Sequence, residues 1–268
     1  MARDKKRRNS GRRSPLAAAV LIGVGLLLTG GVYAGASAAM AATNDTSTQH
    51  SSNLTAEDGK KLFQANCATC HGLDLQGTEN GPSLYGVGEL AVEFQVSTGR
   101  MPLAAQGPQA QIKPAQFTED QVRAMAAYVQ SMAPGPTYPS AITTDGKGNV
   151  ADGAELFRIN CAMCHNVAGA GGALTEGKYA PALNQTSALH MYAAMVTGPQ
   201  NMPVFSNTNL NLSEKRDIIS YLLYLQQNKS PGGYGLGDLG PVSEGLFIWI
   251  FGIGTLIAVT VWITAKSN

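Results

Sequence analysis

The sequence predicts an all-α protein made of two similar helical domains in tandem, with an apolar helix toward each end of the chain. Three observations lead to this prediction. A segment recurs without a gap at an offset of 94 positions (161 minus 67), each copy contains apolar residues at helical spacing, and two uncharged apolar runs flank the repeat. At 268 residues the chain is long enough for two small domains.

Each copy of the repeat begins with a helical pattern that leads into a cysteine motif. Residues 58–67 (DGKKLFQANC) align with residues 152–161 (DGAELFRINC), and the shared Gly-x-x-Leu-Phe is typical of an amphipathic helix. Each copy closes with another helical pattern, expected to begin at Thr118 and at Ser213, because Ser or Thr followed by an acidic residue suits a helix N-terminus. Two further matches lie between these helices: GPSL at 81–84 with APAL at 180–183, and TGRMP at 98–102 with TGPQNMP at 197–203.

All four cysteines lie in two Cys-x-x-Cys-His motifs, which are the attachment pattern of c-type haem. The two thiols of a motif can each form a thioether to a haem vinyl group, and the adjacent histidine can then ligate the iron. The sequence therefore predicts two covalently bound c-type haems and an extracytoplasmic location. The residues expected to bind them are Cys67, Cys70 and His71 in the first copy and Cys161, Cys164 and His165 in the second.

Other uses of these cysteines fit less well. A zinc site would need the two distant Cys-x-x-Cys pairs to meet across domains and would leave both histidines unused. A redox dithiol does not need a histidine after each motif, and a disulfide framework would be thin for a chain of this length.

The N-terminal region predicts a membrane anchor or an export signal. Residues 3–13 contain seven basic residues and one acidic residue, and residues 15–39 are uncharged. The length of the apolar run favours a retained anchor, which needs about 20 residues, whereas its many Gly and Ala residues and the Ala36-Ser37-Ala38 sequence favour a cleaved signal. The basic residues predict a cytoplasmic N-terminus and are not interpreted as a nucleic-acid site.

The C-terminal region predicts a transmembrane helix over residues 246–265. It is uncharged and apolar, and the only two tryptophans, Trp249 and Trp262, lie near its ends, as in an aromatic belt. The resulting topology is a two-helix membrane protein with both ends cytoplasmic and the region between them on the outer face.

The methionines at equivalent positions of the repeat are candidates for the sixth iron ligand. Beyond the motif histidines only His50 and His190 remain, and His190 is expected to be solvated or structural because its counterpart in the first copy is not histidine. Met101 and Met202 each precede a proline, which favours an extended loop conformation. A thioether ligand raises the haem potential relative to a second histidine. Met191 and Met195 are rival candidates near Met202.

Taken together, the two Cys-x-x-Cys-His motifs, the Gly-Pro-x-Leu and Thr-Gly-Arg-Met-Pro sequences and the terminal apolar segments resemble the dihaem cytochrome cc subunit of the actinobacterial cytochrome bcc complex. The resemblance covers essentially the whole chain and implies two tandem class I cytochrome c domains. It implies ligation of the first iron by His71 and Met101 and of the second by His165 and Met202. It also implies that the carbonyl groups of Pro82 and Pro181 orient the two histidines. The insertion before Met202 makes the second ligand loop the less regular match.

The resemblance also implies partners and a reaction. The chain would be a subunit of a menaquinol-oxidising cytochrome c reductase, a translocase, working with a cytochrome b subunit and a Rieske iron–sulfur subunit in a dimeric complex or supercomplex. The first haem would accept electrons from the Rieske cluster and the second would pass them to an aa3-type oxidase. No residue of this chain is expected to act as an acid–base catalyst or to bind quinol.

Two other functions stay open on the sequence alone, and a third is weaker. A dihaem peroxidase would need one iron without a methionine ligand. A dihaem subunit of another membrane oxidase or dehydrogenase would share every motif. A haem-based sensor would need an output domain, for which the chain has no room.

The expected organisation follows from these interpretations. Its segments are a basic N-terminus (1–14), an anchor or signal (15–39), a disordered linker (40–53), cytochrome c domain 1 (54–132), a Pro/Gly linker (133–149), cytochrome c domain 2 (150–228), a Gly/Pro linker (229–245) and a transmembrane helix (246–265).

Overall fold

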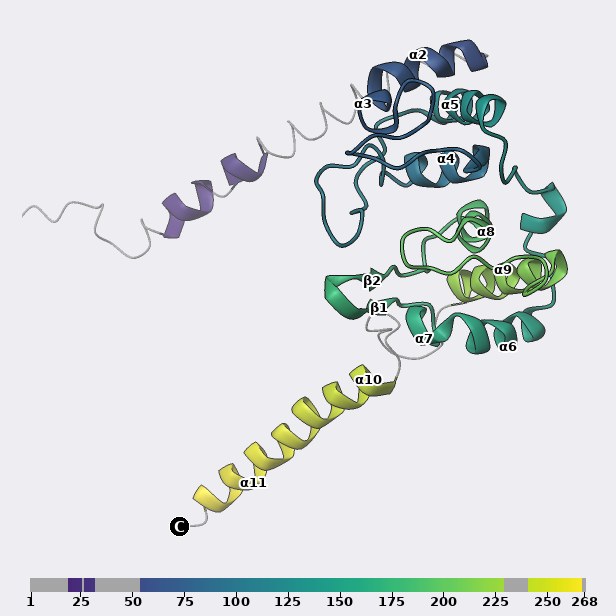
Figure 1. The fold of residues 1–268 in the computed structure, drawn as a ribbon. Coiled ribbons are helices and arrows are strands. Elements are labelled where there is room, and N and C mark those ends of the chain that lie inside the picture. Colours follow the sequence, from purple (N-terminus) through teal and green to yellow (C-terminus); the bar gives the residue numbers. More distant parts are fainter. Residues whose placement is uncertain (1–18, 26, 32–53, 229–240, 267–268) are drawn as a thin grey trace, which may run out of the picture. The chain divides into compact units, whose positions relative to one another are not determined.

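The computed structural model describes residues 19–25, 27–31, 54–228 and 241–266 (Figure 1). The chain divides into two compact units, Met1–Ser52 and Asn53–Asn268. The described residues of the first unit are helical. The expected N-terminus at 1–14, the linker at 40–53 and most of the linker at 229–245 lie outside the described residues.

The first domain is a group of helices in which the longest two begin at matching caps. Thr55 and Thr118 each form a capping box, in which the cap hydroxyl and the side chain three residues on satisfy each other's backbone N–H groups. Packing between the first and last helices buries Phe63 and Val129. The elements are α2 (Ala56–Asn66), α3 (Ala68–His71), α4 (Gly88–Ser97) and α5 (Glu119–Met132).

The second domain repeats this arrangement and adds a small β-ribbon. Its elements are η2 (Ala141–Thr144), α6 (Val150–Asn160), α7 (Ala162–His165), β1 (Gly172–Ala173), η3 (Thr175–Gly177), β2 (Tyr179–Ala180), α8 (Ala188–Thr197) and α9 (Leu212–Gln227). The strands are antiparallel, with Gly172 opposite Ala180. This ribbon departs from the all-α prediction, because the longer loop between α7 and α8 folds back and pairs its own backbone groups. The last helix begins at Leu212 behind an Asn211 cap, slightly before the expected Ser213.

The two domains share an apolar core where α4 packs against α8, and Figure 1 shows these two helices side by side. Leu90 and Phe94 of α4 are almost fully buried in a cluster that includes Met191 and Ala193 of α8. These two helices occupy equivalent places in the repeat: α4 ends just before Thr98-Gly99, and α8 ends within the matching pair, at Thr197. The domains therefore contact each other through equivalent helices, one from each domain. Burial of apolar side chains between these helices stabilises the contact.

A pair of equivalent glycines allows the first and last helices of each domain to approach closely. A Cβ atom at Gly59 would lie 1.9 Å from the carbonyl oxygen of Ala124 in α5. At Gly153 it would lie 2.0 Å from the carbonyl oxygen of Asp217 in α9. Both obstacles are backbone atoms, so a rotamer change cannot relieve the overlap.

We expect Gly59→Ala and Gly153→Ala each to destabilise its domain by about 2 kcal/mol or more, because overpacking outweighs the helix propensity that alanine adds. Thermal unfolding followed by circular dichroism measures the loss. Gly107→Ala is the matched control, since the nearest heavy atom to its added Cβ would be 4.0 Å away. Equal melting temperatures for all three variants would contradict the prediction.

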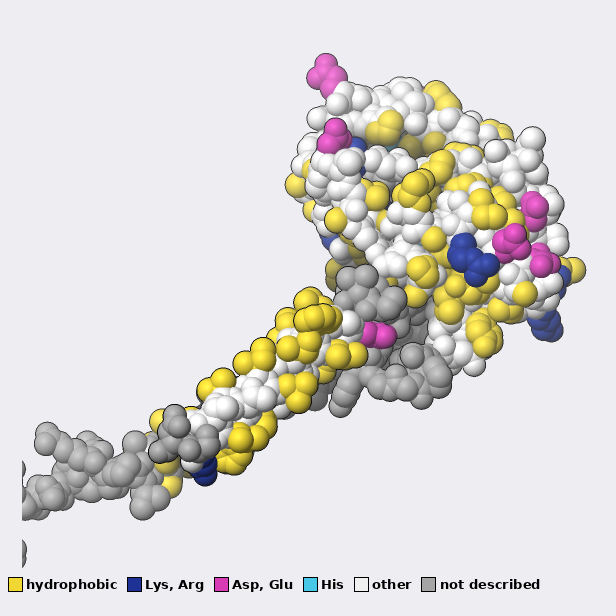
Figure 2. Space-filling view, turned by 90° about the horizontal axis from the view of Figure 1, so that it is seen from below, with side chains coloured by type: hydrophobic (Ala, Val, Ile, Leu, Met, Phe, Trp, Pro, Cys, Tyr) yellow, Lys and Arg dark blue, Asp and Glu magenta, His cyan; other side chains and the backbone are white. Residues whose placement is uncertain are grey.

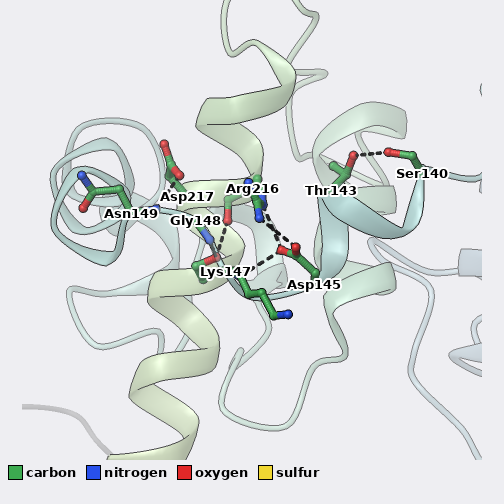
Figure 3. Close-up of polar contacts among 9 residues, drawn as sticks. Ser140, Thr143, Asp145, Lys147, Gly148, Asn149, Arg216 and Asp217 are labelled. Carbon is green, nitrogen blue, oxygen red and sulfur yellow. Dashed lines mark hydrogen bonds and ion pairs between the residues drawn. The ribbon is translucent and has the colours of Figure 1, made fainter.

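The segment expected to link the domains is fixed to α9 by polar contacts (Figure 3). The Asp145 carboxylate accepts hydrogen bonds from Nε and Nη2 of Arg216, at 2.9 and 2.7 Å. The backbone N–H of Gly148 donates to Oγ of Ser220 at 2.8 Å. A two-point guanidinium–carboxylate contact fixes direction as well as distance. The later part of the link thus packs as part of the second domain.

One helix in the described part of the chain is long and apolar enough to cross a membrane. It runs over Ser243–Lys266, from within α10 (Pro241–Phe247) through the π-helical segment η5 (Ile248–Ile253) to the end of α11 (Gly254–Lys266). Its visible face in Figure 2 is covered by hydrophobic side chains. Within the predicted segment 15–39, the described residues form only the shorter apolar helix Ala19–Gly31. The expectation of two membrane helices is therefore supported at the C-terminal end alone.

Candidate haem-binding sites

The two Cys-x-x-Cys-His motifs adopt the same backbone geometry. Cys67 ends α2 with φ −121° and ψ −31°, and Cys161 ends α6 with φ −120° and ψ −34°. Each of these residues then starts the one-turn helix, α3 or α7, that contains the second cysteine and the histidine. The second cysteines, Cys70 and Cys164, are exposed. The two motifs therefore share their backbone conformation as well as their sequence pattern.

Burial makes the first thiol of each motif a poor acid. It raises the pKa of Cys67 to about 11 and that of Cys161 to about 12. A redox-active dithiol needs the opposite, a pKa lowered toward neutrality so that thiolate is available. None of the four cysteines forms a disulfide. No group of three or more potential metal-ligating side chains occurs in the described ranges, so the zinc alternative also lacks a ligand set there.

Each motif histidine has its Nδ1 atom next to a proline carbonyl oxygen. The distance is 2.8 Å from His71 to Pro82 and 2.9 Å from His165 to Pro181. Because a carbonyl oxygen can only accept, Nδ1 must donate, and the neutral ring then keeps its lone pair on Nε2. Burial also lowers the pKa of His165, which favours that neutral form. Both rings are thus suited to bind a metal through Nε2.

A cavity of about 440 Å³ opens beside the second motif. Its lining includes Cys161, Cys164 and His165 of the motif and also Met202. Cavities that hold small molecules or cofactors measure roughly 300–1,000 Å³ and are mostly apolar. The cavity brings the predicted thiols, histidine and methionine of the second site together, and this arrangement fits a covalently attached haem.

The predicted methionines lie in loops beside the motifs. Met101 packs against the cluster of Val96, Val122 and Met125, which Cys67 also contacts. Met202 is only partly buried and its loop is held by a backbone hydrogen bond from Phe205 to Met195, at 2.8 Å. The rivals Met191 and Met195 lie on α8, are 4% and 3% exposed, and also border the second cavity. Met191, Met195 and Met202 thus all border the second cavity.

The histidines outside the motifs differ in their surroundings. His50 lies outside the described residues. His190 is half-buried at the contact between the domains, with Nε2 2.9 Å from Oγ of Ser97 and its ring edge-on to Phe94. Burial lowers its pKa. It is therefore a residue of the domain contact and not a solvated one.

Lys215 is a buried residue of the second domain that the sequence analysis missed. It lies four positions after the cap of α9, where α5 has the buried Val122, yet it is completely buried. Its amine donates to Oδ1 of Asn207 at 3.0 Å and to the carbonyl oxygen of Leu210. Burial lowers its pKa. The lysine therefore ties the loop that follows Met202 to the last helix.

We expect Lys215→Met to destabilise the second domain by on the order of 2 kcal/mol, because the buried carbonyl oxygen of Leu210 and the side chain of Asn207 both lose their donor. The loop next to Met202 should loosen as well, so that the haem of this domain binds carbon monoxide faster. Calorimetry and flash photolysis measure the two effects. Lys147→Met is the control, since that lysine is exposed. An unchanged melting temperature together with unchanged carbon monoxide binding would show that the buried amine does not hold the loop.

Comparison with known families defines the class of the protein. Residues 56–133 match the family model for cytochrome c, and residues 148–222 match the model described as cytochrome C oxidase, cbb3-type, subunit III. With one Cys-x-x-Cys-His motif in each match, the chain is a c-type cytochrome that binds two haems.

Curated relatives narrow the class to one family. Proteins named cytochrome bc1 complex cytochrome c subunit include one from Mycobacterium tuberculosis, 44% identical over 263 residues, which are 95% of this chain and 92% of that protein. Another from Corynebacterium efficiens is 49% identical over 226 residues, covering 78% and 76%. The chain belongs to the family of cytochrome bc1 complex cytochrome c subunits, and its role is electron transfer.

A more distant match concerns the alternative function as a subunit of a membrane dehydrogenase. The cytochrome c subunit of an alcohol dehydrogenase (quinone) from Komagataeibacter europaeus is 30% identical over 145 residues. The match covers 46% of this chain and 31% of that protein. This likeness spans less than half of the chain, whereas the relatives above span most of it.

Proposed function

We propose that this protein is the dihaem electron-transfer subunit of a menaquinol:cytochrome c reductase. It accepts electrons from a Rieske iron–sulfur protein at the first haem domain and delivers them from the second to an aa3-type oxidase. Haem supplies a reversible one-electron couple. The polypeptide binds the two haems, keeps water from their apolar faces and holds the domains together.

The observation on which this proposal rests is the shared core of the two domains. Leu90 and Phe94 of α4 are buried against α8 of the second domain, so the two haem sites belong to one packed body. Two sites in one body exchange electrons without a diffusional encounter, which raises their effective concentration. This suits a carrier that replaces a freely diffusing cytochrome.

Ligation of both irons by histidine and methionine is part of the proposal. The contacts of the histidine Nδ1 atoms with Pro82 and Pro181 support Nε2 as the iron ligand. We assign His71 and Met101 to the first iron and His165 and Met202 to the second. With both irons six-coordinate, neither offers the open position that a peroxidase needs.

Membrane attachment is the last part of the proposal. The helix Ser243–Lys266 anchors the C-terminal end, and the apolar segment at 15–39 serves as a second anchor or as an export signal. The haem domains lie on the outer face, the side on which covalent haem attachment takes place. A cytochrome b subunit and a Rieske subunit are the expected companions in a dimeric complex or supercomplex.

Purification of the tagged full-length chain from membranes of its own host tests this function. We expect cytochrome b, a Rieske protein and an aa3-type oxidase to accompany it, and menaquinol to reduce its haems. The same preparation with Rieske-site inhibition should leave the haems oxidised. Recovery with a dehydrogenase and without cytochrome b would instead assign the chain to a dehydrogenase.

A further inference from the structure

Arg100 is a buried cation without a polar partner in the part of the chain that the structure describes. Its side chain is 6% exposed, and its guanidinium lies over the ring of Phe94, 4.7 Å from the ring centroid. No hydrogen bond or ion pair of this side chain occurs among the described residues. A buried charge is costly unless it is paired and hydrogen-bonded. The ring contact offsets only part of that cost.

Although Arg100 belongs to the first domain, it borders the cavity beside the second motif. Phe94, Thr98 and Ile112 of the first domain border the same cavity. The cavity next to Cys161 and Cys164 is therefore closed by residues from both domains.

This shared wall is held in place by specific contacts. The side-chain amide of Gln109 donates to the carbonyl oxygen of Tyr179 at 2.9 Å and accepts from the Tyr179 N–H at 2.8 Å. The backbone N–H of Ala110 donates to the side chain of Gln200 at 3.2 Å. Both contacts join the loop after Met101 to the second domain, on strand β2 and on the loop before Met202. The part of the first domain that borders the cavity is thus held to the second domain by hydrogen bonds.

The other charged groups near the cavity already have partners. Lys178, which also borders it, pairs with Glu176 at 3.1 Å. The buried Glu93 accepts a hydrogen bond from the Tyr138 hydroxyl at 2.9 Å and lies 4.0 Å from His190. Within the described ranges, Arg100 is thus left as an unpaired positive charge at a cavity that fits haem. Haem presents two propionates, and a carboxylate is the anion that a guanidinium fork matches best.

We propose that Arg100 of the first domain binds a propionate of the haem attached to the second domain. The haem of Cys161 and Cys164 is then held by both domains, and its environment depends on their contact. A positive charge at the propionate favours the reduced haem, which has one positive charge less at iron. Arg100 therefore raises the potential of the second haem and helps to set the direction of electron flow between the two.

Redox titration of the intact dihaem protein tests this assignment. Arg100→Gln removes the charge and should lower the midpoint of the second haem alone, changing the electron equilibrium between the haems about tenfold, or about 59 mV for one electron. Arg100→Lys keeps the charge and should keep most of the potential. Lys178→Gln is the matched control, because it borders the same cavity but is already neutralised, and should shift the midpoint less. A variant without the second motif's cysteines identifies the first haem's midpoint.

Resonance Raman spectra of the propionate bending mode give a second readout. Loss of the guanidinium hydrogen bonds should shift this band in both Arg100 variants and leave it in place in Lys178→Gln. If Arg100→Gln fails to bind two haems, Arg100→Lys provides the test. A shifted propionate band in that variant supports the proposal, and an unshifted band contradicts it. The proposal is overturned if neither midpoint nor band changes, if the first haem responds in place of the second, or if Lys178→Gln has an equal effect. None of these outcomes depends on which complex contains the chain.

Discussion

Replacing both cysteines of one motif with alanine will reduce the covalently bound haem from two per chain to one. The thioethers are the only covalent links available, since each motif supplies two thiols and the chain has no others. We expect this result for the pair Cys67 and Cys70 and equally for Cys161 and Cys164. Pyridine haemochrome assay and haem staining on denaturing gels measure the content, and intact mass confirms it.

The altered domain should also lose much of its stability, because an apolar cavity loses the group that fills it. Loss of buried contacts on this scale costs several kcal/mol, by the logic of large-to-small core substitutions. Thr69→Ala and Met163→Ala are matched controls, since both change a motif without touching a thiol and Met163 is 92% exposed. Two haems remaining after a double substitution would refute covalent attachment at that motif. Loss of both haems would instead show that the domains do not take up haem independently.

The parts of the fold that the sequence predicted well are those set by local patterns. The motif helices and the closing helices depend on spacing and caps within one stretch of chain, and α5 indeed begins behind Thr118. The shift of the α9 start to Asn211 is small, because Asn caps a helix as well as Ser does. The ribbon of β1 and β2 was not predicted, since strands of two residues have no periodicity to detect.

The site was predictable where the sequence repeats itself and unpredictable where the domains meet. Duplication draws attention to both motifs and to the residues that match between copies. Arg100 and Lys215 have no counterpart of the same type, because the repeat pairs them with Pro199 and Val122. Their roles arise from contacts between distant segments, which no local pattern reveals. The only sequence feature that indicates Lys215 is its charge at a helix position where the first copy has the buried Val122.

Met202→Leu will convert the second haem from a six-coordinate low-spin centre to a species without methionine ligation. Leucine fills similar volume, so the packing penalty should stay below about 1.5 kcal/mol while the iron loses its sulfur ligand. The methionine-to-iron absorption band should fall by half, and carbon monoxide should bind to one haem per chain. Met202→His should restore six-coordination and lower that midpoint on the order of 0.1 V, within the roughly 0.8 V that axial ligands control.

Met191→Leu and Met195→Leu decide between the three methionines at this cavity. Both side chains are almost fully buried on α8 and pack in the core shared by the domains, so their sulfur atoms are expected to serve packing alone. Each variant should keep the full methionine-to-iron band and both midpoints. If either one loses half of the band while Met202→Leu keeps it whole, the ligand comes from α8. Met101 and Met202 would then match in sequence but not in function. The iron ligand of the second domain would come from a helix, whereas that of the first domain comes from a loop.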